Sequence, residues 1–373
     1  MTTVHPRDDS RILHKEIRTL ARKTGETVAM FVQDGEGDAV DERNHCIIID
    51  TGPALPRLKR MTLGAWRMIR AVRTAQPKLV IFHDPELIPW APLLQLAGIK
   101  VIYDVHENYP GQIGRNPRLP KVLRPALSRI TWLIERIYSR IFTGIIAVDP
   151  TVAAPFPQHK TVVVRNYPIV SELLSPTPRK MTERPKHFSY VGTISEDRNL
   201  LAMTECVHAL GDPEARLRLA GNFVVPGLEE QVRATPAWQS VIYEGWLSRE
   251  GVRDLLAETR AGLLLIKPIA HEMTGMPIKM CEYMAAGIPL IASNFPLWKE
   301  IIEGAGAGLT VDPLDKAAIT EAMRWIIENP EEATIMGQRG RQAVLEKYNW
   351  DNQEGELLRI VQQSLGSRFR APS

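Results

Sequence analysis

Short apolar runs alternate with amphipathic stretches along most of the chain. The runs are rich in Val, Ile and Leu and end in polar residues, as strands buried on both faces of a parallel sheet do. The stretches between them repeat apolar positions with the period of a helix. In the first half the predicted strands are 78–84, 100–107, 143–149 and 160–168, and the predicted helices are 14–25, 63–75, 90–98 and 127–141. This alternation predicts an α/β fold whose parallel sheet carries helices on both faces.

The alternation stops at 171–187, a charged segment with three prolines that is typical of a linker. It then resumes, which predicts a second α/β domain. The strands expected there are 187–194, 216–223, 240–246, 261–268, 289–295 and 307–312, and a helix is expected from about 351 to 365. The predicted division is therefore 1–170, a linker at 171–187, 188–350, a helix at 351–366 and a tail at 367–373. Both domains are expected to be Rossmann-like, doubly wound sheets that face a cleft.

Length and composition agree with this division. A chain of 373 residues is longer than one ordinary core, and a hydrophobic fraction of 44% with 24% charged residues is that of a globular protein. The three cysteines have no paired spacing, which indicates a reducing compartment. The start is polar rather than signal-like, and no apolar run reaches the length of about 18 residues that a spanning helix needs. We expect a cytoplasmic protein.

Charge is distributed unevenly. The net charge is only +3, yet residues 53–145 hold 15 Lys/Arg against 5 Asp/Glu. Such a basic half indicates an anionic partner, although a solvated basic face is the alternative. Segments 57–73 and 115–142 combine arginines with aromatic residues, which suits the surface of an anionic membrane. Nucleic acid is not expected as a partner, because no recognised binding motif accompanies the charge.

Ligands of open α/β sheets bind at the carboxyl ends of the strands, so polar residues at predicted strand ends are the first site candidates. The segment 275–293 adds another. Lys279 and Glu282 are three residues apart and share one helix face, Pro277 suits the first helical position, and Gly287 ends the helix. Amide groups at the helix start and Lys279 suit a phosphate, and Glu282 suits a ribose diol. The alternative is an ordinary surface pair. The strand-end candidates are His83, Asp84, Asp104, His106, Glu107, Gly192, Thr193, Gly221, Asn222, Glu244 and Gly245.

The pattern P-x-K-x-x-E-Y-M-A-x-G-x-P-L-I-A-S at 277–293 resembles the donor-site segment of retaining glycosyltransferases of GT-B fold, of the family-4 type. Other segments match in the same order along nearly the whole chain. The closing NWDNQEGELLRIV resembles the last helix of that fold, which crosses back onto the first domain. HDPEL at 83–87, YDVHE at 103–107 and NYP at 166–168 resemble a bacterial subgroup that builds surface polysaccharides.

The resemblance implies a role for each site candidate. Arg198 and Lys279 would contact the donor diphosphate, Glu282 the ribose, and His106 the region of the donor sugar, where it could orient a hydroxyl or carry a proton. Implied catalytic residues are thus His106, Arg198 and Lys279. Implied donor-binding residues are Gly192, Thr193, Arg198, Glu244, Gly245, Thr274, Gly275, Met276, Lys279 and Glu282. Candidates for the acceptor are Asp9, Arg11, His83, Asp84 and Glu86, whose alternative role is a capping network that holds the loops.

Two features depart from the family pattern. The common E-x7-E pair has its second glutamate at Glu282, but Thr274 stands at the first position. The usual Gly-Gly loop after the first strand is missing, HPRDDSRI (5–12) stands in its place, and the first strand is expected to be nearly absent.

The predicted function is metal-independent transfer of a hexose from a UDP- or GDP-linked donor to a saccharide or lipid-linked acceptor, without a cofactor. No metal-ligand spacing is evident. The alternatives are a sugar-nucleotide epimerase of the same fold and a non-catalytic nucleotide-sugar-binding subunit. A dehydrogenase is not expected, because no G-x-G-x-x-G follows the early strands.

Overall fold

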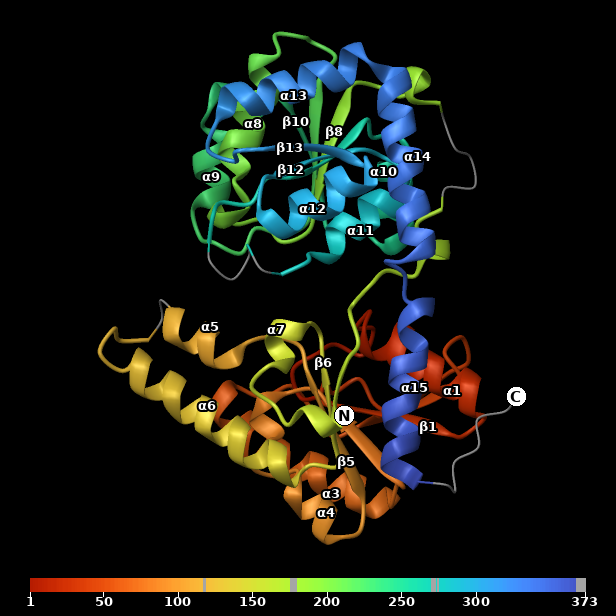
Figure 1. The fold of residues 1–373 in the computed structure, drawn as a ribbon. Coiled ribbons are helices and arrows are strands. Elements are labelled where there is room, and N and C mark those ends of the chain that lie inside the picture. The colour runs from red at the N-terminus through yellow and green to blue at the C-terminus, as the bar shows by residue number, and fades with distance from the viewer. Residues whose placement is uncertain (117–118, 175–179, 270–272, 274, 367–373) are drawn as a thin grey trace. The chain divides into compact units, whose positions relative to one another are not determined.

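The computed structural model describes residues 1–116, 119–174, 180–269, 273 and 275–366 (Figure 1). The chain divides into two compact units. Unit 1 comprises Met1–Asn166 and the segment that starts at Gln353, and unit 2 comprises Tyr167–Asn352. The last helix, α15 (Asp351–Leu365), therefore belongs almost entirely to unit 1.

The strands of unit 1 form two hydrogen-bonded groups. One is the parallel sheet β4-β5-β6-β7, whose members lie within the four predicted strands. The other has the order β1-β3-β2 and was not predicted from the sequence. The strands are β1 (Val28–Val32), β2 (Ala39–Asp41), β3 (Cys46–Asp50), β4 (Leu79–Phe82), β5 (Lys100–Val105), β6 (Gly144–Ala147) and β7 (Thr161–Val163).

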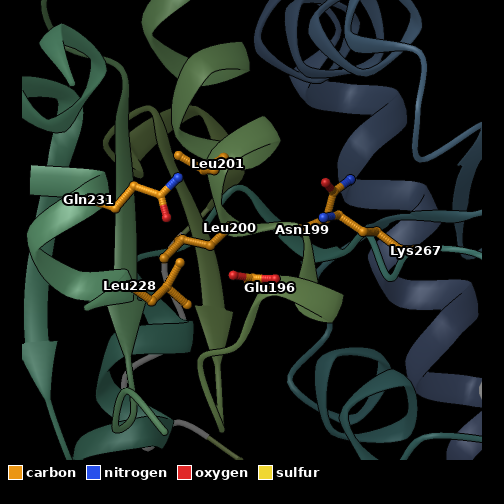
Figure 2. Close-up of a pocket in the computed structure, with 7 residues that line it drawn as sticks. All are labelled: Glu196, Asn199, Leu200, Leu201, Leu228, Gln231 and Lys267. Atoms are coloured by element: carbon orange, nitrogen blue, oxygen red, sulfur yellow. The ribbon is translucent and has the colours of Figure 1, made fainter. Parts of the chain in front are cut away.

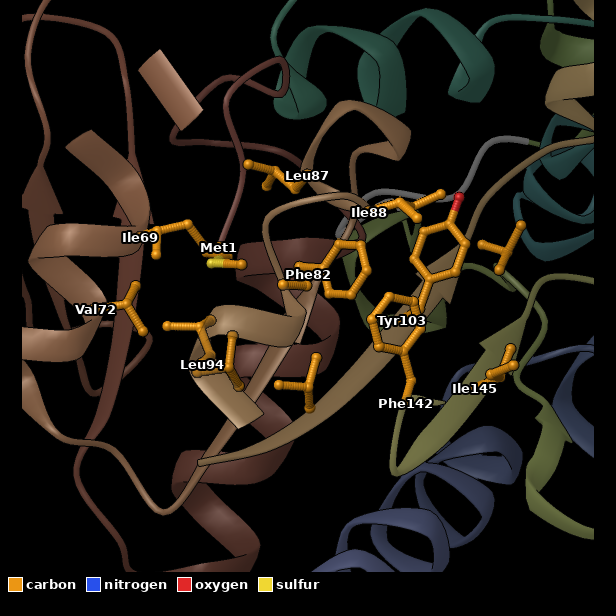
Figure 3. Packing of buried hydrophobic residues seen from close by; sticks show 14 of the residues in the cluster. Met1, Ile69, Val72, Phe82, Leu87, Ile88, Leu94, Tyr103, Phe142 and Ile145 are labelled. Atoms are coloured by element: carbon orange, nitrogen blue, oxygen red, sulfur yellow. The ribbon is translucent and has the colours of Figure 1, made fainter. Parts of the chain in front are cut away.

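The first residues of the chain join these two groups. The Met1 nitrogen donates to the Ile81 carbonyl of β4, and the His83 amide donates to the Met1 carbonyl. On the other side the Thr2 amide donates to the Phe31 carbonyl of β1. As expected, no strand is assigned before η1, but Met1 and Thr2 bond to both β4 and β1 and so lie between them. The side chain of Met1 reaches into the core cluster of unit 1 (Figure 3).

Helices cover the sheet of unit 1, and α15 lies against it. The Gln353 side chain accepts a hydrogen bond from the Arg165 amide, and Gly144 of β6 abuts Ile360 of α15. The helices are η1 (Ile12–Ile17, a π-helix), α1 (Arg18–Thr24), α2 (Arg57–Lys59), η2 (Arg60–Gly64, a π-helix), α3 (Ala65–Ala75), η3 (Pro85–Leu87), α4 (Pro92–Leu96), α5 (Tyr109–Arg115), α6 (Arg124–Ile141), α7 (Pro150–Ala153) and η4 (Gln158–Lys160). None of the described helices has the length and apolar character needed to cross a membrane.

Unit 2 has one six-stranded sheet with the order β10-β9-β8-β11-β12-β13, parallel throughout. In sequence order this is 3-2-1-4-5-6, the order of a Rossmann fold, so the switch point lies between β8 and β11. All six strands begin within the predicted apolar runs. They are β8 (His187–Val191), β9 (Arg216–Ala220), β10 (Val241–Gly245), β11 (Ala261–Leu264), β12 (Leu290–Ser293) and β13 (Gly308–Val311).

Two hydrophobic clusters fill the two faces of this sheet. Leu264 of β11 packs with α10, α11, α12 and α14, while the neighbouring Leu263 packs with α8, α9 and α13. This alternation explains why the strands are apolar at every position. The helices of unit 2 are η5 (Val170–Glu172), η6 (Met181–Glu183), η7 (Glu196–Arg198), α8 (Leu200–Ala209), α9 (Leu228–Arg233), η8 (Pro236–Ser240), α10 (Arg249–Ala257), α11 (Ile278–Ala285), α12 (Pro296–Ala305), α13 (Lys316–Glu328) and α14 (Pro330–Glu346).

The ends of α11 correct one prediction and confirm another. Pro277 is not the first helical residue but the N-cap, with an extended ψ of 137°, so Ile278 is the first helical residue. Gly287 ends the helix as predicted, with a φ of 68°. The amides of Gly287 and Ile288 donate to the carbonyls of Met284 and Tyr283, which is the Schellman arrangement.

Candidate functional site

The carboxyl ends of three neighbouring strands in unit 2 form an edge of glycine turns. Gly192 after β8, Gly221 after β9 and Gly245 at the end of β10 have φ values of 129°, 135° and 66°. The Gly192 amide donates to the Ala220 carbonyl at 2.8 Å, and the Gly221 amide to the Gly245 carbonyl at 2.7 Å. A Cβ atom on Gly221 would lie 1.9 Å from the Gly192 carbonyl oxygen, so only glycine allows the two turns to approach. We call these three turns the glycine edge.

Lys279 of α11 lies directly against this edge. A Cβ atom on Gly192 would be 2.1 Å from the Lys279 Cε and 2.5 Å from its Nζ. The ammonium group also lies 5.4 Å from the centroid of the Tyr190 ring. The predicted donor residues Gly192 and Lys279, which are 87 positions apart in the sequence, are therefore neighbours. The absence of a side chain on Gly192 is what makes room for the cation.

Two buried aromatic residues hold α11 in this position. The Tyr283 ring packs against Gly262 of β11, and its hydroxyl accepts a hydrogen bond from the Val191 amide at 3.0 Å. The Trp298 indole donates to the Gly275 carbonyl at 2.8 Å, which fixes the turn before the helix. Sequence reasoning did not assign roles to Tyr283 and Trp298. The tyrosine of the E-Y-M motif was visible as a signal, but its contact with β8 was not.

The two predicted acidic donor residues differ in their surroundings. Glu282 is half-buried on α11, and among the described residues its carboxylate has no hydrogen-bond or ion-pair partner. Glu244 is paired instead: Arg218 of β9 donates to it from Nε at 2.7 Å and from Nη2 at 2.6 Å. Arg218 also bonds Glu258 at 2.9 Å. The carboxylate of Glu282 is thus the one of the two that can accept from a ligand without breaking an ion pair.

Arg198 ends the short helix η7, which follows the glycine turn after β8. Asn199 comes next in a left-handed conformation (φ 59°), and its side-chain amide donates to the Pro313 carbonyl at 2.6 Å. The Lys267 amide, beyond β11, donates to the Asp197 carbonyl at 2.9 Å. This bond joins the two loops that flank the switch point between β8 and β11.

A small open pocket lies beside this turn (Figure 2). Its volume of about 240 Å³ is below the 300–1,000 Å³ of ordinary ligand pockets, so it can hold only part of a ligand. It does not include the glycine edge or Lys279. The lining residues are Glu196, Asn199, Leu200, Leu201, Leu228, Gln231 and Lys267.

In unit 1 a buried carboxylate, Asp104 at the end of β5, gathers the predicted polar residues. Arg11 donates to its two oxygens from Nε at 3.0 Å and from Nη2 at 2.8 Å. Nδ1 of His83 and Nε2 of His106 lie 3.0 Å and 2.7 Å from its Oδ2. Asp104, Arg11 and His83 are almost fully buried, whereas 13% of the His106 side chain remains exposed. Arg11 and His83, the buried partners of Asp104, face away from solvent. His106 is therefore the outward member of the network.

The loop after Met1–Thr3 completes this cluster. Asp84 accepts hydrogen bonds from Thr2 and Thr3, and Asp9 accepts from the amides of Arg11 and Ile12. His5 lies between them, with its Nδ1 3.0 Å from Asp9 and its ring 4.9 Å from that of His106. Glu86 binds Arg60 at 2.7 Å and 3.1 Å and accepts from Thr3 at 2.6 Å. The predicted acceptor residues therefore bond one another and the loops beside them.

Burial decides which groups of this cluster carry charge. Desolvation lowers the pKa of His83 to about 4, so this imidazole is neutral at physiological pH. Burial alone would raise the pKa of Asp104, but the Arg11 charge and the two histidine bonds hold it well below the usual range. Burial and the charge of Asp104 raise the pKa of the neighbouring Glu16 well above its usual range. Asp104 therefore carries the negative charge that balances Arg11.

His83, Asp104 and His106 place three ligand-type atoms within 4.8 Å of one another, which is the spacing of a metal site. Both imidazoles point at the same carboxylate oxygen, and both carboxylate oxygens also accept from Arg11. A cation placed among these atoms would have to displace the guanidinium charge. The three residues are accounted for by hydrogen bonds, and they do not fit a metal ion in this arrangement.

The remaining predicted donor residues are close to the same features. The Thr193 carbonyl accepts from the Tyr190 hydroxyl at 2.8 Å, and Met276 packs on the cluster that includes α11. Thr274, the position of the missing glutamate, lies outside the described residues. The NYP motif has a supporting role, because buried Lys15 donates to Asn166 at 2.7 Å and the Trp350 amide donates to the Pro168 carbonyl.

Two Rossmann-like units with parallel sheets fit the GT-B class of fold. Comparisons with known proteins agree. The family model "Glycosyl transferases group 1" matches residues 176–343, and "Glycosyltransferase Family 4" matches residues 10–166. The chain belongs to the GT-B glycosyltransferases of the family-4 type.

Curated relatives share only part of their length with the chain. An MMP alpha-(1->4)-mannosyltransferase of Mycolicibacterium hassiacum is 22% identical over 47% of this chain and 43% of its own. The O-antigen chain mannosyltransferase B of Escherichia coli is 28% identical over 44% of this chain and 42% of its own. The matched region thus spans less than half the length of either relative.

Solved structures share the fold over almost the whole chain. The sucrose-phosphate synthase of Thermosynechococcus elongatus has a TM-score of 0.68 at 17% identity and covers 94% of this chain and 91% of its own. HepE from Anabaena, in complex with UDP, has a TM-score of 0.69 at 11% identity and covers 93% of this chain and 94% of its own. At these identities the likeness concerns the fold alone.

Proposed function

We propose that the protein is a retaining glycosyltransferase that moves a hexose from a UDP- or GDP-linked donor to a saccharide or lipid-linked acceptor. The observation that carries this proposal is the contact between the Lys279 ammonium and the glycine edge at the switch point of unit 2. Backbone amides at the start of α11 and Lys279, the second residue of the helix, suit a diphosphate. The names of the relatives, which include mannosyltransferases, favour sugar transfer.

In the proposed reaction the bond between the anomeric carbon and the donor phosphate oxygen breaks, and the acceptor oxygen bonds to the same face of that carbon. The acceptor proton goes to the departing phosphate oxygen, so no protein nucleophile is needed. Lys279 and Arg198 would stabilise the charge that develops on the leaving diphosphate. Because these cations and the α11 amides can stabilise the negative charge of the diphosphate, we propose that no metal is required and that no cofactor takes part.

Glu282 would accept hydrogen bonds from the ribose hydroxyls, since it is the carboxylate of the site without a partner among the described residues. In unit 1 we assign acceptor-side contact to His106, because it is the outward member of the Asp104 network. Arg11 and His83, which are buried and bonded to Asp104, would position His106 rather than touch the acceptor.

The proposal extends to location. A lipid-linked acceptor requires the protein to work at a membrane, so we propose that it is cytoplasmic and peripheral on an anionic surface. The basic excess of residues 53–145 supports this.

The first test is a thermal-shift screen of UDP, GDP and their sugar conjugates, because a bound donor stabilises the fold in proportion to its affinity. Lys279→Met should abolish the shift, whereas Lys299→Met, an exposed lysine of α12, should keep it. Loss of the shift in both variants, or in neither, would contradict the assignment of Lys279.

Radiolabelled donor then separates the reactions. Transfer to an acceptor extract in the presence of EDTA is the expected result. Conversion of donor in the absence of acceptor would identify an epimerase instead. Binding without any turnover would identify a nucleotide-sugar-binding subunit.

A further inference from the structure

Helix α6 carries an apolar face that no other described element covers. Its inward side holds Glu135 and Ser139, which are buried, and Ser128, which donates to the Pro110 carbonyl of the neighbouring α5 at 2.7 Å. Figure 1 shows α5 and α6 side by side. On the outward side a stripe of leucine and isoleucine recurs every three or four residues, each between 36% and 53% exposed. The stripe consists of Leu123, Leu127, Ile130, Leu133, Ile137 and Ile141.

Such a stripe is unusual on a soluble protein. Single exposed leucines are common, but contiguous apolar patches mark a surface that meets a partner or a membrane. The helical spacing puts five of the six side chains along one side of a helix of 18 residues, which is about 27 Å long, and Leu123 is the N-cap before them. The partner surface must therefore be apolar over a comparable length.

The positive charge around the stripe favours anionic lipid over a second copy of the chain as the partner. Residues 108–148 contain seven Lys/Arg and one acidic residue, Glu135, which points inward. Arg129, Arg136 and Arg140 are exposed and share one side of the helix. A second copy of the chain would bring the same positive charges together, whereas anionic lipid headgroups would attract them. Trp132, whose ring lies 5.2 Å from the Arg136 guanidinium, is the kind of aromatic residue found at membrane interfaces.

The helix suits the plane of the interface rather than a crossing. It contains five charged residues, four arginines and Glu135, among its 18 positions. An apolar face with arginines beside it is the pattern of a helix that lies in the headgroup region with its apolar side toward the acyl chains.

The other basic segment, 57–73, lacks such a face. The apolar side chains of its helix α3, including Met68, Ile69 and Val72, are buried in the core of unit 1. Leu58, Met61, Leu63 and Trp66 are exposed, but their spacings of three, two and three residues do not keep them on one side of a helix as in the α6 stripe. The insertion surface is therefore expected on α6.

We propose that the stripe of α6 inserts into the outer part of an anionic lipid bilayer and anchors unit 1 on it. This anchoring rests on the proposed function, because a membrane anchor serves an enzyme whose acceptor is linked to a lipid. Its test does not depend on sugar transfer, so the two can fail separately.

The experiment is co-sedimentation of the full chain with phosphatidylglycerol-containing vesicles and with pure phosphatidylcholine vesicles. The expected result is binding to the anionic vesicles only. Ile137→Glu should weaken this binding at least tenfold, because it places a carboxylate in the stripe. Ile335→Glu on α14 is the matched control, since Ile335 is 46% exposed and Ile137 is 47% exposed, and it should bind like the wild type.

Two further measurements, of thermal stability and of Trp132 fluorescence, make each outcome decisive. Both variants should keep the wild-type melting temperature and the donor thermal shift, which shows that the fold and the donor site are intact. Trp132 fluorescence, assigned by difference from Trp132→Phe, should be quenched by lipids brominated in the acyl chains. Equal binding by Ile137→Glu and the wild type would overturn the proposal. So would a dimer in lipid-free solution that Ile137→Glu dissociates, because the stripe would then belong to a second copy.

Discussion

The two polar sites of the molecule use their charges in opposite ways. In unit 1 the carboxylate of Asp104 accepts from Arg11, His83 and His106, and most of this network is buried. In unit 2 the cation of Lys279 lies against a backbone edge without side chains, and the neighbouring Glu282 is half-buried. The first site satisfies its polar groups internally, whereas the second leaves the Glu282 carboxylate without a partner among the described residues.

This difference separates support from recognition. A buried network whose members bond one another fixes loop geometry, and removing one member leaves the others without partners. A site that receives a charged ligand has to keep donors and acceptors available. We therefore expect substitutions in the Asp104 network to lower stability, and substitution of Glu282 to weaken binding with little change in stability.

The largest effect is expected for Asp104→Asn. The substitution breaks the buried ion pair between Asp104 and Arg11 and leaves Arg11 beside Glu16, whose carboxylate lies 2.9 Å from the Arg11 Nε. Breaking one partner of a buried pair costs up to about 3–5 kcal/mol. Hydrogen exchange of the β4–β6 peptides should report this loss of local stability in unit 1. The control is Glu26→Gln, which removes only an exposed pair with Lys78.

Glu26→Gln should exchange like the wild type. If Asp104→Asn also exchanges like the wild type, the network contributes nothing to the stability of unit 1, and the contrast between the two sites is wrong. If hydrogen exchange in Asp104→Asn is as slow as in the wild type but donor binding is lost, the Asp104 network binds the donor and does not support the fold.

Glu135 is buried on the inner side of α6, 3.4 Å from the Tyr103 hydroxyl, and has no cationic partner among the residues that the structure describes, so it sharpens the comparison. Burial raises its pKa from 4.5 to about 7. The protonated acid contributes stability that is complete below pH 4.5 and is lost as pH rises through about 7. At about pH 8 the loss amounts to about 3 kcal/mol. Glu135→Gln should therefore stabilise unit 1 at about pH 8 and leave it unchanged at about pH 4.

Urea unfolding of the wild type and Glu135→Gln at the two pH values measures this difference. Glu26→Gln again serves as the control, since Glu26 is exposed. A midpoint that shifts equally at both pH values would show that Glu135 does not titrate between them.

The fold was predictable where apolar runs are uninterrupted. All six strands of unit 2 and the bounds of α15 follow from them, because a strand buried on both faces must be apolar at every position. The strands β1, β2 and β3 were missed, although β1 and β3 are apolar, because the acidic segment between these two, which contains β2, looks like an extended loop. The strand-like place of Met1 and Thr2 depends on hydrogen bonds to β1 and β4, which no local pattern encodes.

The sites were predictable in part for a related reason. The i, i+3 spacing of Lys279 and Glu282 can be seen in the sequence, and so can the glycines at the strand ends. The network around Asp104 cannot, because Arg11 lies 93 residues from it and they meet only through the order of the strands. Burial of Arg11 and His83, on which their proposed positioning role rests, also depends on that order.

Gly192→Ala should weaken nucleotide binding. The new Cβ atom would overlap the Lys279 side chain, and the φ of 129° strains any residue other than glycine. Loss of a charge-assisted contact costs about 1.5–3 kcal/mol, so the affinity for UDP or GDP should fall about tenfold to a hundredfold. Calorimetry measures it. Gly304→Ala in α12, where a Cβ atom meets nothing within 4 Å, is the control and should bind like the wild type.

The smallest expected effect is the loss of one hydrogen bond between Glu282 and a ribose hydroxyl group. If its carboxylate accepts from the ribose, the wild type should bind the 2′-deoxy form of its nucleotide about tenfold more weakly than the ribose form, since a hydrogen bond to a charged group contributes about 1.5 kcal/mol or more. Glu282→Ala should bind both forms with the same low affinity and melt like the wild type, because its carboxylate supports no other described residue. Glu300→Ala, an exposed glutamate of α12, should retain the discrimination. Discrimination that survives in Glu282→Ala would place the ribose contact on another residue, and unit 2 would then present only its cation and its backbone edge to the donor.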